Sequence, residues 1–288
     1  MKILWLLLPL VVEATVLAHG DSGTPARTLQ KATGIQPKMP AVASTRLNTK
    51  DRLTYVWIPG GAFAMGCSPE DSECFDDEKP SHQVTISTGF WIGQTLVTQA
   101  AYKQIVGVSP SRFKGGQFPV EMVSWDEAQT YCRRVGMRLP TEAEWERAAR
   151  AGYTGSRYGQ LDSIAWYVGN SGPQPVDGAV LYQRDPKNYE QILIAMGNQT
   201  HPVGQKQANA WGLYDMLGNL WEWTADWYDK NYYGNGGARD PTGPGSGTNR
   251  APRGGAWDDS ARNIRLSNRY SLRPSSRAFY AGFRCVGK

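Results

Sequence analysis

The segment from Trp211 to Trp227, WGLYDMLGNLWEWTADW, restricts the possible folds more than any other part of the chain. It holds four tryptophans, too many large aromatic side chains for a solvated loop, so most of them must be buried. Polar side chains buried among them need partners inside the protein. The alternation Leu-Trp-Glu-Trp-Thr from Leu220 predicts a strand with one buried and one wet face.

Two carboxylates in this segment, Asp215 and Glu222, flank the backbone around Gly218. A hard cation such as Ca2+ binds carboxylate and carbonyl oxygens together, so these groups could surround one. The alternative is a tryptophan-rich core turn whose carboxylates cap backbone amides. Residue spacing alone leaves both possibilities open.

The N-terminal part of the chain predicts export. Residues 1–20 start with Met-Lys and continue with an apolar run too short to span a bilayer, which is typical of a signal peptide. Glu13 interrupts that run, so an uncleaved anchor or a misassigned start is the alternative. Residues 21–51 have the composition of a flexible linker, and residues 52–288 suit one domain. We expect a periplasmic or secreted protein with no membrane span in its mature form.

The four cysteines are an even number, and in an exported chain they predict two disulfides. Cys67 and Cys74 enclose a short acidic loop, so a local bridge between them is natural, and Cys132 would then pair with Cys285. A zinc site is a poor alternative, because the chain has no CxxC motif and few histidines.

The net charge of +5 is unevenly distributed. The stretch from Arg250 to Lys288 has nine Lys or Arg and two Asp, a net of +7, so the rest of the chain sums to −2. A basic patch can bind nucleic acid, but export argues against that partner. We expect these arginines either to satisfy carbonyls and carboxylates within irregular structure or to face an anionic ligand.

Local patterns predict an α+β fold with little regular secondary structure. Capping boxes at Ser124 and Thr141 predict two helices, ending near Val135 and Ala151. Beyond Gly152 the hydrophobic periodicity fades, and a long irregular segment is expected to about residue 201. The other predicted elements are a helix over 98–106 and strands over 55–58, 62–65, 82–86 and 89–93.

At this point the chain resembles the formylglycine-generating enzyme family, the sulfatase-modifying factors. The matching pieces are IPGGAFAMG, HQVTIS, PVEMVSWDEAQTYC, RLPTEAEWERAAR, HPVGQ, NAWGLYDMLGNLWEWTADWY, PRGGAW and GFRCV, in that order from residue 58 to 286. The resemblance implies a single domain related to the C-type lectin fold, low in regular structure and stapled by calcium.

The resemblance also implies particular site residues. The calcium motif of the family falls on Asp215, Gly218, Leu220 and Glu222, with backbone carbonyls of the middle two as ligands. A second calcium site would use the region of Asn170 and Ser171, although the insertion-like stretch from residue 173 to 200 blurs that match. The family joins cysteines at the positions of Cys132 and Cys285, in agreement with the pairing above.

The chain departs from the family where formylglycine generators carry their copper-binding cysteine pair. The span from Trp257 to Tyr270 has no cysteine, and Ala256 stands where the family has a serine. Copper(I) prefers soft thiolates, so the hard carboxylates of Asp258 and Asp259 cannot replace them. Copper and formylglycine formation by the family mechanism are therefore not expected, while the identity of any other redox cofactor stays open.

Three functions fit these observations. The first is an exported oxidoreductase acting on a peptide or peptide-derived substrate, as the pyoverdine-maturation oxidase of this family does. The second is a non-catalytic module that presents a pocket to a ligand, and the third is an accessory subunit of an exported complex. The resemblance favours the first, and a sulfatase-modifying enzyme proper is the least favoured.

The family's activity maps to the region where Trp221, Trp257 and the span from residue 258 to 269 converge. Asp258 or Asp259 could act there as a general base, with Arg262 or Arg265 holding an anionic group of the substrate. The alternative is that the aspartates pair with those arginines and only fix the loop.

Overall fold

The structure is a computed structural model that describes residues 44–288. The expected signal peptide and most of the expected linker lie outside these residues. The expected linker boundary at residue 51 is wrong, because strand β1 (Thr45–Leu47) pairs antiparallel with β2 (Thr54–Ile58). Asp51 is also buried, where it accepts a hydrogen bond from the Tyr55 hydroxyl at 3.0 Å. An edge strand of three residues has too short an alternation to be recognised in the sequence.

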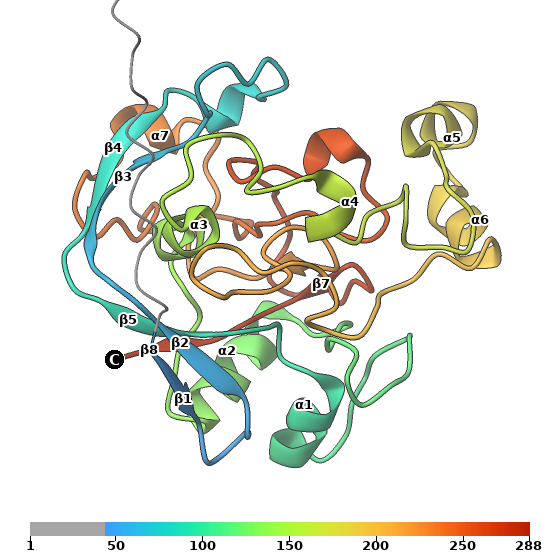
Figure 1. Cartoon of the computed structure of the whole chain (residues 1–288), viewed down its shortest axis with the longest axis horizontal. Helices are drawn as coiled ribbons and strands as arrows, with labels where there is room; N and C mark the ends of the chain where they lie inside the picture. Colours follow the sequence, from blue (N-terminus) through green and yellow to red (C-terminus); the bar gives the residue numbers. More distant parts are fainter. Residues whose placement is uncertain (1–43) are drawn as a thin grey trace, which may run out of the picture. The chain divides into compact units, whose positions relative to one another are not determined.

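The largest sheet joins the start and the end of the described domain (Figure 1). Its strand order is β1-β2-β5-β8, and each neighbouring pair is antiparallel. Strands β2 and β3 follow each other in the chain but do not form a hairpin, because β3 pairs with β4 in a separate sheet. The remaining strands are β3 (Gly61–Met65), β4 (His82–Ile86), β5 (Phe90–Gly93), β6 (Trp221–Glu222), β7 (Ala281–Gly282) and β8 (Val286–Gly287).

The first three helices begin and end as the capping residues predict. They are α1 (Gln99–Val106), α2 (Trp125–Arg134) and α3 (Glu142–Arg150). Ser124 and Thr141 each accept a hydrogen bond from the third amide of their helix, and the glutamate there accepts one from the capping residue's amide. Side chains and backbone thus satisfy amides that a helix start otherwise leaves unpaired.

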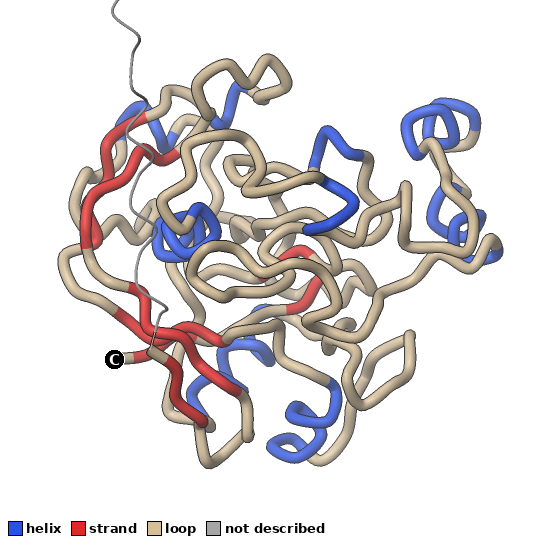
Figure 2. The backbone as a smooth tube through the Cα atoms, in the orientation of Figure 1, coloured by secondary structure: helices blue, strands red, loops and turns tan. Residues whose placement is uncertain are grey.

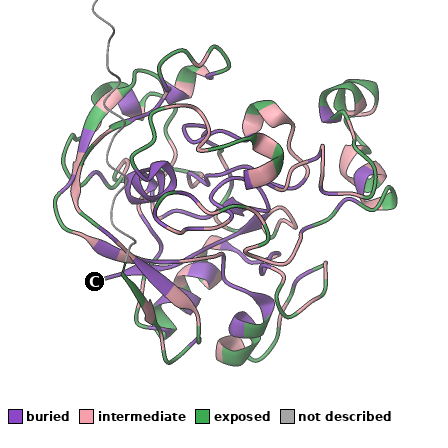
Figure 3. Ribbon diagram, viewed as in Figure 1, coloured by how far each residue is buried: buried purple, intermediate pink, exposed green. Residues whose placement is uncertain are grey.

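Helix α3 is buried along its whole length although five of its nine residues are charged. Figure 3 shows it in the buried colour near the middle of the domain. Glu142 pairs with Arg269 at 2.7 Å, and Glu146 pairs with Arg253 at 2.7 Å. These contacts confirm that arginines of the basic C-terminal stretch satisfy carboxylates inside the protein, as buried charges require.

The expectation of an irregular segment from residue 152 to 201 is wrong in part. Three helices form there, α4 (Leu161–Ile164), α5 (Gly178–Arg184) and α6 (Tyr189–Ala195). None exceeds seven residues, too short for a 3.6-residue periodicity to stand out. The other short elements are α7 (Tyr232–Asn235) and the 3-10 turns Asp76–Glu78 and Ala261–Asn263.

Most of the described backbone is loop, and much of that loop is buried (Figures 2 and 3). Trp211, Trp221 and Trp223 are buried, which confirms that most tryptophans of the segment from Trp211 to Trp227 are core. The indole of Trp223 donates to the Val123 carbonyl at 3.0 Å, so its polar atom is satisfied. The domain is a mixed α+β fold, and no helix within residues 44–288 is long and apolar enough to cross a membrane.

Both expected disulfides form. Cys67 bonds to Cys74, and Cys132 on α2 bonds to Cys285 beside the last strand. The second bridge spans 153 residues and therefore ties the middle of the chain to its C-terminal end. All four cysteines of the sequence are used in these two bridges.

Candidate functional site

A pocket of about 510 Å3 opens beside the loop from Asp258 to Asn263. Helices α5 and α6 supply one wall, and Figure 1 shows these two helices together, away from the strands of the largest sheet. We call it the acidic pocket. Its carboxylates are Glu190, Asp258 and Asp259, its aromatic residues are Phe75, Tyr182, Tyr189, Trp221, Tyr270 and Tyr280, and its cation is Arg262.

Four of the five predicted catalytic residues line this pocket, and Trp257 does not. The expectation for Trp257 is wrong, because its side chain is fully buried in the core. Its ring packs edge-on against Phe113, with 5.3 Å between the ring centres, and its indole donates to the Phe279 carbonyl at 3.2 Å. Trp257 thus supports the loop that carries the two aspartates from behind.

Asp259 fixes the shape of the loop. Its Oδ2 accepts from the Ala256 amide at 2.9 Å, and its Oδ1 accepts from Asn263 Nδ2 at 2.7 Å. Burial raises the pKa of Asp259 to about 6, while Asn263, the Ala256 amide and Trp221 act in the opposite direction. The alternative that the aspartates pair with Arg262 or Arg265 is therefore wrong for Asp259, whose partners are an asparagine and a backbone amide.

Asp258 is held by its backbone rather than by its carboxylate. The Tyr189 hydroxyl on α6 donates to the Asp258 carbonyl at 2.6 Å, which links the insertion to the loop. Within the described residues, no side chain forms a hydrogen bond or ion pair with the Asp258 carboxylate. Burial, together with the nearby Asp259 and Glu190 carboxylates, raises the pKa of Asp258 well above its ordinary value. A pocket carboxyl whose pKa is raised in this way is a candidate for proton transfer to or from a ligand.

Stacked aromatic rings form another wall of the pocket. Trp221 stacks on Tyr270 with 4.9 Å between ring centres, and Tyr280 meets Tyr270 edge-on at 6.3 Å. Burial raises the pKa of Tyr270 and Tyr280, so both hydroxyls stay protonated and can donate hydrogen bonds at neutral pH. These surfaces suit a flat ligand that stacks on rings.

Several pocket residues could not be identified from the sequence. Tyr182, Tyr189 and Glu190 lie in the insertion, where no motif marks them. Tyr270 and Tyr280 lie within the basic stretch from Arg250 to Lys288, where no hydrophobic periodicity indicates which side chains face a pocket.

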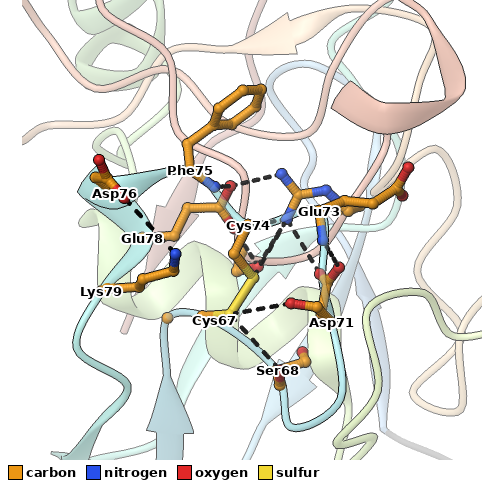
Figure 4. Close-up of a disulfide and its surroundings, with 12 residues drawn as sticks. Cys67, Ser68, Asp71, Glu73, Cys74, Phe75, Asp76, Glu78 and Lys79 are labelled. Atoms are coloured by element: carbon orange, nitrogen blue, oxygen red, sulfur yellow. Dashed lines mark hydrogen bonds and ion pairs between the residues drawn. A yellow bond between two sulfur atoms is a disulfide. The ribbon is translucent and has the colours of Figure 1, made fainter.

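The two arginines expected to hold a substrate have different surroundings. Arg265 is fully buried and pairs with Glu78 at 2.5 Å and Asp71 at 3.1 Å, so it is unavailable to a ligand. Arg262 is exposed at the rim, with its guanidinium 4.2 Å from the centre of the Phe75 ring. Figure 4 shows Phe75 following directly on the Cys67–Cys74 bridge. That bridge therefore constrains the loop that places Phe75 at the pocket.

The predicted calcium residues do not line the acidic pocket: Asp215, Gly218 and Leu220 lie on an irregular turn, and Glu222 follows on β6. Asp215 and Asn219 have left-handed backbone angles, φ of 54° and 67°, as does Gly218 at 73°. A Cβ at Gly218 would lie 2.3 Å from the Trp166 carbonyl oxygen, so only glycine fits there. Strained backbone of this kind often marks a functional turn.

The two carboxylates of the predicted calcium site, Asp215 and Glu222, have different partners. Asp215 is buried, and its Oδ2 accepts from the Gly204 amide at 2.7 Å while its Oδ1 has no hydrogen-bond partner among the described residues. Burial raises the pKa of Asp215 to about 6. Glu222 already has a cation, because Arg284 donates to both of its oxygens at 2.7 Å. Trp145 also donates to Oε2, so Oε1 is the oxygen of Glu222 with room for a further partner.

The expected second calcium site at Asn170 has a different role in the structure. The Asn170 side chain accepts from the Tyr167 amide at 3.0 Å and donates to the Ala165 carbonyl at 3.0 Å. The side-chain oxygen of Asn170, which a metal would need as a ligand, is therefore already used to close a turn. Across residues 44–288, no group of three His, Cys, Asp or Glu side chains is arranged to hold a metal by side chains alone.

Comparisons with known proteins agree with these features. Residues 41–288 match the family model of the sulfatase-modifying factor enzyme 1-like domain. The formylglycine-generating enzyme of Streptomyces coelicolor is 30% identical over 80% of this chain and 88% of its own. The chaperone protein LppX of Paenibacillus barcinonensis is 31% identical over 79% of this chain and 86% of its own.

Two solved structures are similar over nearly their whole length. PvdO from Pseudomonas aeruginosa superimposes with a TM-score of 0.70 at 25% identity, covering 86% of this chain and 99% of its own. Treponema denticola variable protein 1 gives a TM-score of 0.69 at 26% identity, with the same coverage of both chains.

Proposed function

Since the chain belongs to the sulfatase-modifying factor enzyme family, we propose that it is an exported oxidoreductase that acts on a peptide-derived substrate in the acidic pocket. The observation that carries this proposal is Asp258, a carboxyl with a raised pKa in a pocket walled by aromatic rings. Such a group is suited to accept a proton from a bound substrate.

The family's copper chemistry is not available to this chain. Formylglycine generators resemble it elsewhere, but all four of its cysteines are consumed in disulfides, so no thiol remains to bind copper. The chemistry must therefore come from other groups, and the carboxylates of the acidic pocket are the nearest candidates at the corresponding place in the fold.

We infer a two-electron dehydrogenation in which the substrate loses two electrons and two protons. The Asp258 carboxylate accepts one proton, and Trp221 and Tyr270 stack against the planar product as its double bond forms. Dioxygen is the proposed oxidant, and it takes up both electrons and two protons to leave as hydrogen peroxide.

The shape of the site supports a substrate larger than a single small molecule. A second hollow of about 720 Å3 shares Gly178, Ala179, Ser260 and Arg262 with the acidic pocket. The two hollows together can accept an extended peptide with one modified residue in the acidic pocket. Export is supported by the two disulfides, which persist in oxidising compartments such as the periplasm.

The test is oxygen consumption with reduced peptide-derived chromophores, followed with an electrode and by absorbance. Asp258→Asn should lower kcat about 10²- to 10⁴-fold, as removal of a general base does, while the variant stays folded. The matched control Asp126→Asn lies on the exposed part of α2 and should keep the parent rate. Equal rates for parent and Asp258→Asn, or conversion of a sulfatase cysteine to an aldehyde, would contradict the proposal.

A non-catalytic binding module is the second candidate. It is favoured by Asp259, whose two oxygens are both engaged in holding the loop, and by a relative of 31% identity that is named a chaperone protein. Tight binding of the same chromophores without oxygen uptake or peroxide formation would identify this function.

We also propose a structural calcium ion at Asp215, with the carbonyls of Gly218 and Leu220 and with Glu222 Oε1. The partnerless, buried Asp215 Oδ1 and the strained turn around Gly218 support it. An ion bound only by the folded protein stabilises it, by about 4 kcal/mol at a thousandfold excess over Kd.

Chelation therefore predicts a lower melting temperature. EDTA should reduce Tm by about 8–16 °C, and Asp215→Asn should melt at the same temperature with and without EDTA. Without calcium, Asp215→Asn should be at least as stable as the parent, since it removes a buried carboxyl with no partner for Oδ1. An unchanged parent Tm in EDTA, with no calcium by elemental analysis, would exclude the ion.

A further inference from the structure

Several buried glutamates elsewhere in the described domain are neutralised by arginine. Glu78 pairs with Arg265, Glu146 with Arg253, and Glu222 with Arg284, at 2.5 to 2.7 Å. Burying a carboxylate without a counter-charge is unfavourable, and this chain has many arginines with which to avoid it.

The three carboxylates of the acidic pocket are half-buried and lie together without such an arginine. Within residues 44–288, neither Asp258, Asp259 nor Glu190 has a Lys, Arg or His nitrogen within ion-pair distance. They lie close enough together that Asp259 and Glu190 both raise the pKa of Asp258. The pocket therefore gathers negative charge that no ion pair within the described part of the chain balances.

The one cation of the pocket is directed elsewhere. Arg262 lies against the Phe75 ring at the rim, and its Nε donates to the Glu73 carbonyl at 3.4 Å. Tyr189, Tyr270 and Tyr280 are neutral, because burial raises their pKa values. With three carboxylates against one arginine, the ionised pocket carries a net negative charge.

We propose that the acidic pocket selects a planar cation, an amidinium or guanidinium group of the substrate, which pairs with Asp258 and Glu190 and stacks on the Trp221–Tyr270 wall. This inference rests on the proposed function only for the location of the site. It replaces the anionic group that the sequence suggested for this region, because Arg262 lies at the rim whereas the carboxylates lie inside.

A planar cation fits better than an ammonium ion. Carboxylates accept two parallel hydrogen bonds from an amidinium or guanidinium fork, whereas an ammonium is a point charge. Flat cations also stack on aromatic faces, and this chain already uses that contact, with Arg250 lying 3.7 Å from the Trp125 ring centre and 3.4 Å from that of Trp227. In the acidic pocket, the guanidinium or amidinium group of a bound ligand could stack on the aromatic wall in the same way.

The test is calorimetric titration of the full mature chain with benzamidine, benzamide and benzoate at pH 8. These three probes have the same ring and nearly the same shape but are cationic, neutral and anionic. Benzamidine should bind at least about tenfold more tightly than benzamide, and benzoate should bind most weakly. Higher salt should weaken benzamidine binding and leave benzamide binding unchanged.

Variants locate the binding. Asp258→Asn and Glu190→Gln should each reduce benzamidine affinity at least about fivefold while leaving benzamide affinity unchanged. Glu70→Gln removes the same charge from an exposed position away from the pocket and should have no effect. Melting curves of each variant show whether it is folded, and a folded double variant Asp258→Asn with Glu190→Gln should lose the preference for the cation.

Three results would overturn the inference: no benzamidine binding at millimolar concentration, equal affinity for benzamidine and benzamide, or tightest binding of benzoate. The outcome is independent of turnover. Benzamidine binding without any oxygen consumption would exclude the proposed oxidoreductase function and keep the cation site. Oxidation of a neutral substrate, with no preference for cations, would keep the oxidoreductase function and exclude the cation site.

Discussion

At the scale of single residues, two groups of charges in the described domain differ in how they are paired. Arg253, Glu142 and Glu146 belong to a closed network in which each charge has an opposite partner within 3.2 Å. Asp258 and Glu190, both half-buried, belong to a group with no such partner among residues 44–288. The first group stabilises the fold, and the second is the arrangement expected of a site that binds or transforms something.

The paired group predicts a large loss of stability on removal of one partner. Arg253→Met leaves Glu142 and Glu146 with one guanidinium each, and should lower the free energy of unfolding by about 3–5 kcal/mol. The corresponding fall in Tm is about 6–20 °C by calorimetry. The control Arg239→Met affects an exposed pair at 4.0 Å and should change stability by less than about 1 kcal/mol. Similar losses for both variants would refute this distinction.

The unpaired group predicts a pH-dependent gain of stability. The pKa of Asp258 is raised in the folded protein, so the folded state binds its proton more tightly than the unfolded state does. Ionised Asp258 therefore lowers the free energy of unfolding. This loss is absent at low pH, begins above the ordinary pKa of 3.8 and is complete above the folded-state pKa.

Asp258→Asn should therefore melt close to the parent near pH 4 and about 2–4 °C higher at pH 8. Glu70→Gln, which removes a charge at the exposed surface, is the control and should show no such gain. A parent that is more stable than Asp258→Asn at pH 8 would show that the carboxylate has a partner in solution.

At the scale of elements, the α5–α6 segment leaves and rejoins the domain at one place. The Gln199 amide donates to the Ser171 carbonyl at 3.2 Å, and Asn198 Nδ2 donates to the Ser171 hydroxyl at 2.9 Å. The segment contributes Tyr189 and Glu190 to the acidic pocket, so it extends the fold with a wall for ligand binding.

Excision of residues 173–197, closed with a short Gly-Ser linker, should leave a folded domain with less affinity for its ligand. Loss of the buried Leu193 should cost about 2–5 kcal/mol of stability, because its packing is removed. Benzamidine affinity should fall at least about tenfold, since one carboxylate and two tyrosines leave the pocket. Circular dichroism and titration measure the two effects, and undiminished affinity would place the binding site elsewhere.

At the scale of the whole molecule, covalent links compensate for a scarcity of regular secondary structure. The main sheet has strands from both ends of the described domain, and the Cys132–Cys285 bridge joins the same regions. A bridge across a long loop restricts the unfolded chain most, so this one should contribute more than the local Cys67–Cys74 bridge.

The chain-entropy relation predicts about 5 kcal/mol for the bridge over 153 residues and about 2 kcal/mol for the bridge over 7. Replacing Cys132 and Cys285 with alanine should therefore lower the free energy of unfolding more than replacing Cys67 and Cys74. Urea denaturation without reductant measures both, and the opposite order would contradict the loop-length argument.

The sequence by itself determined the local features of the protein. Capping boxes located α2 and α3, cysteine count and spacing predicted both disulfides, and long motifs identified the family. These signals depend on residues adjacent in the chain, or on exact patterns that survive divergence, so they can be read without knowledge of the packing.

Only the tertiary structure decided the pairing of charges and the composition of the pocket. Asp259 bonds to Asn263 rather than to an arginine, Trp257 is core, and Tyr189 and Glu190 reach the site from an insertion with no motif. The physical reason is distance along the chain. Whether a charge finds a partner depends on groups up to about 190 residues away, as for Arg265 and Glu78, and no local pattern encodes which of many arginines and carboxylates will meet.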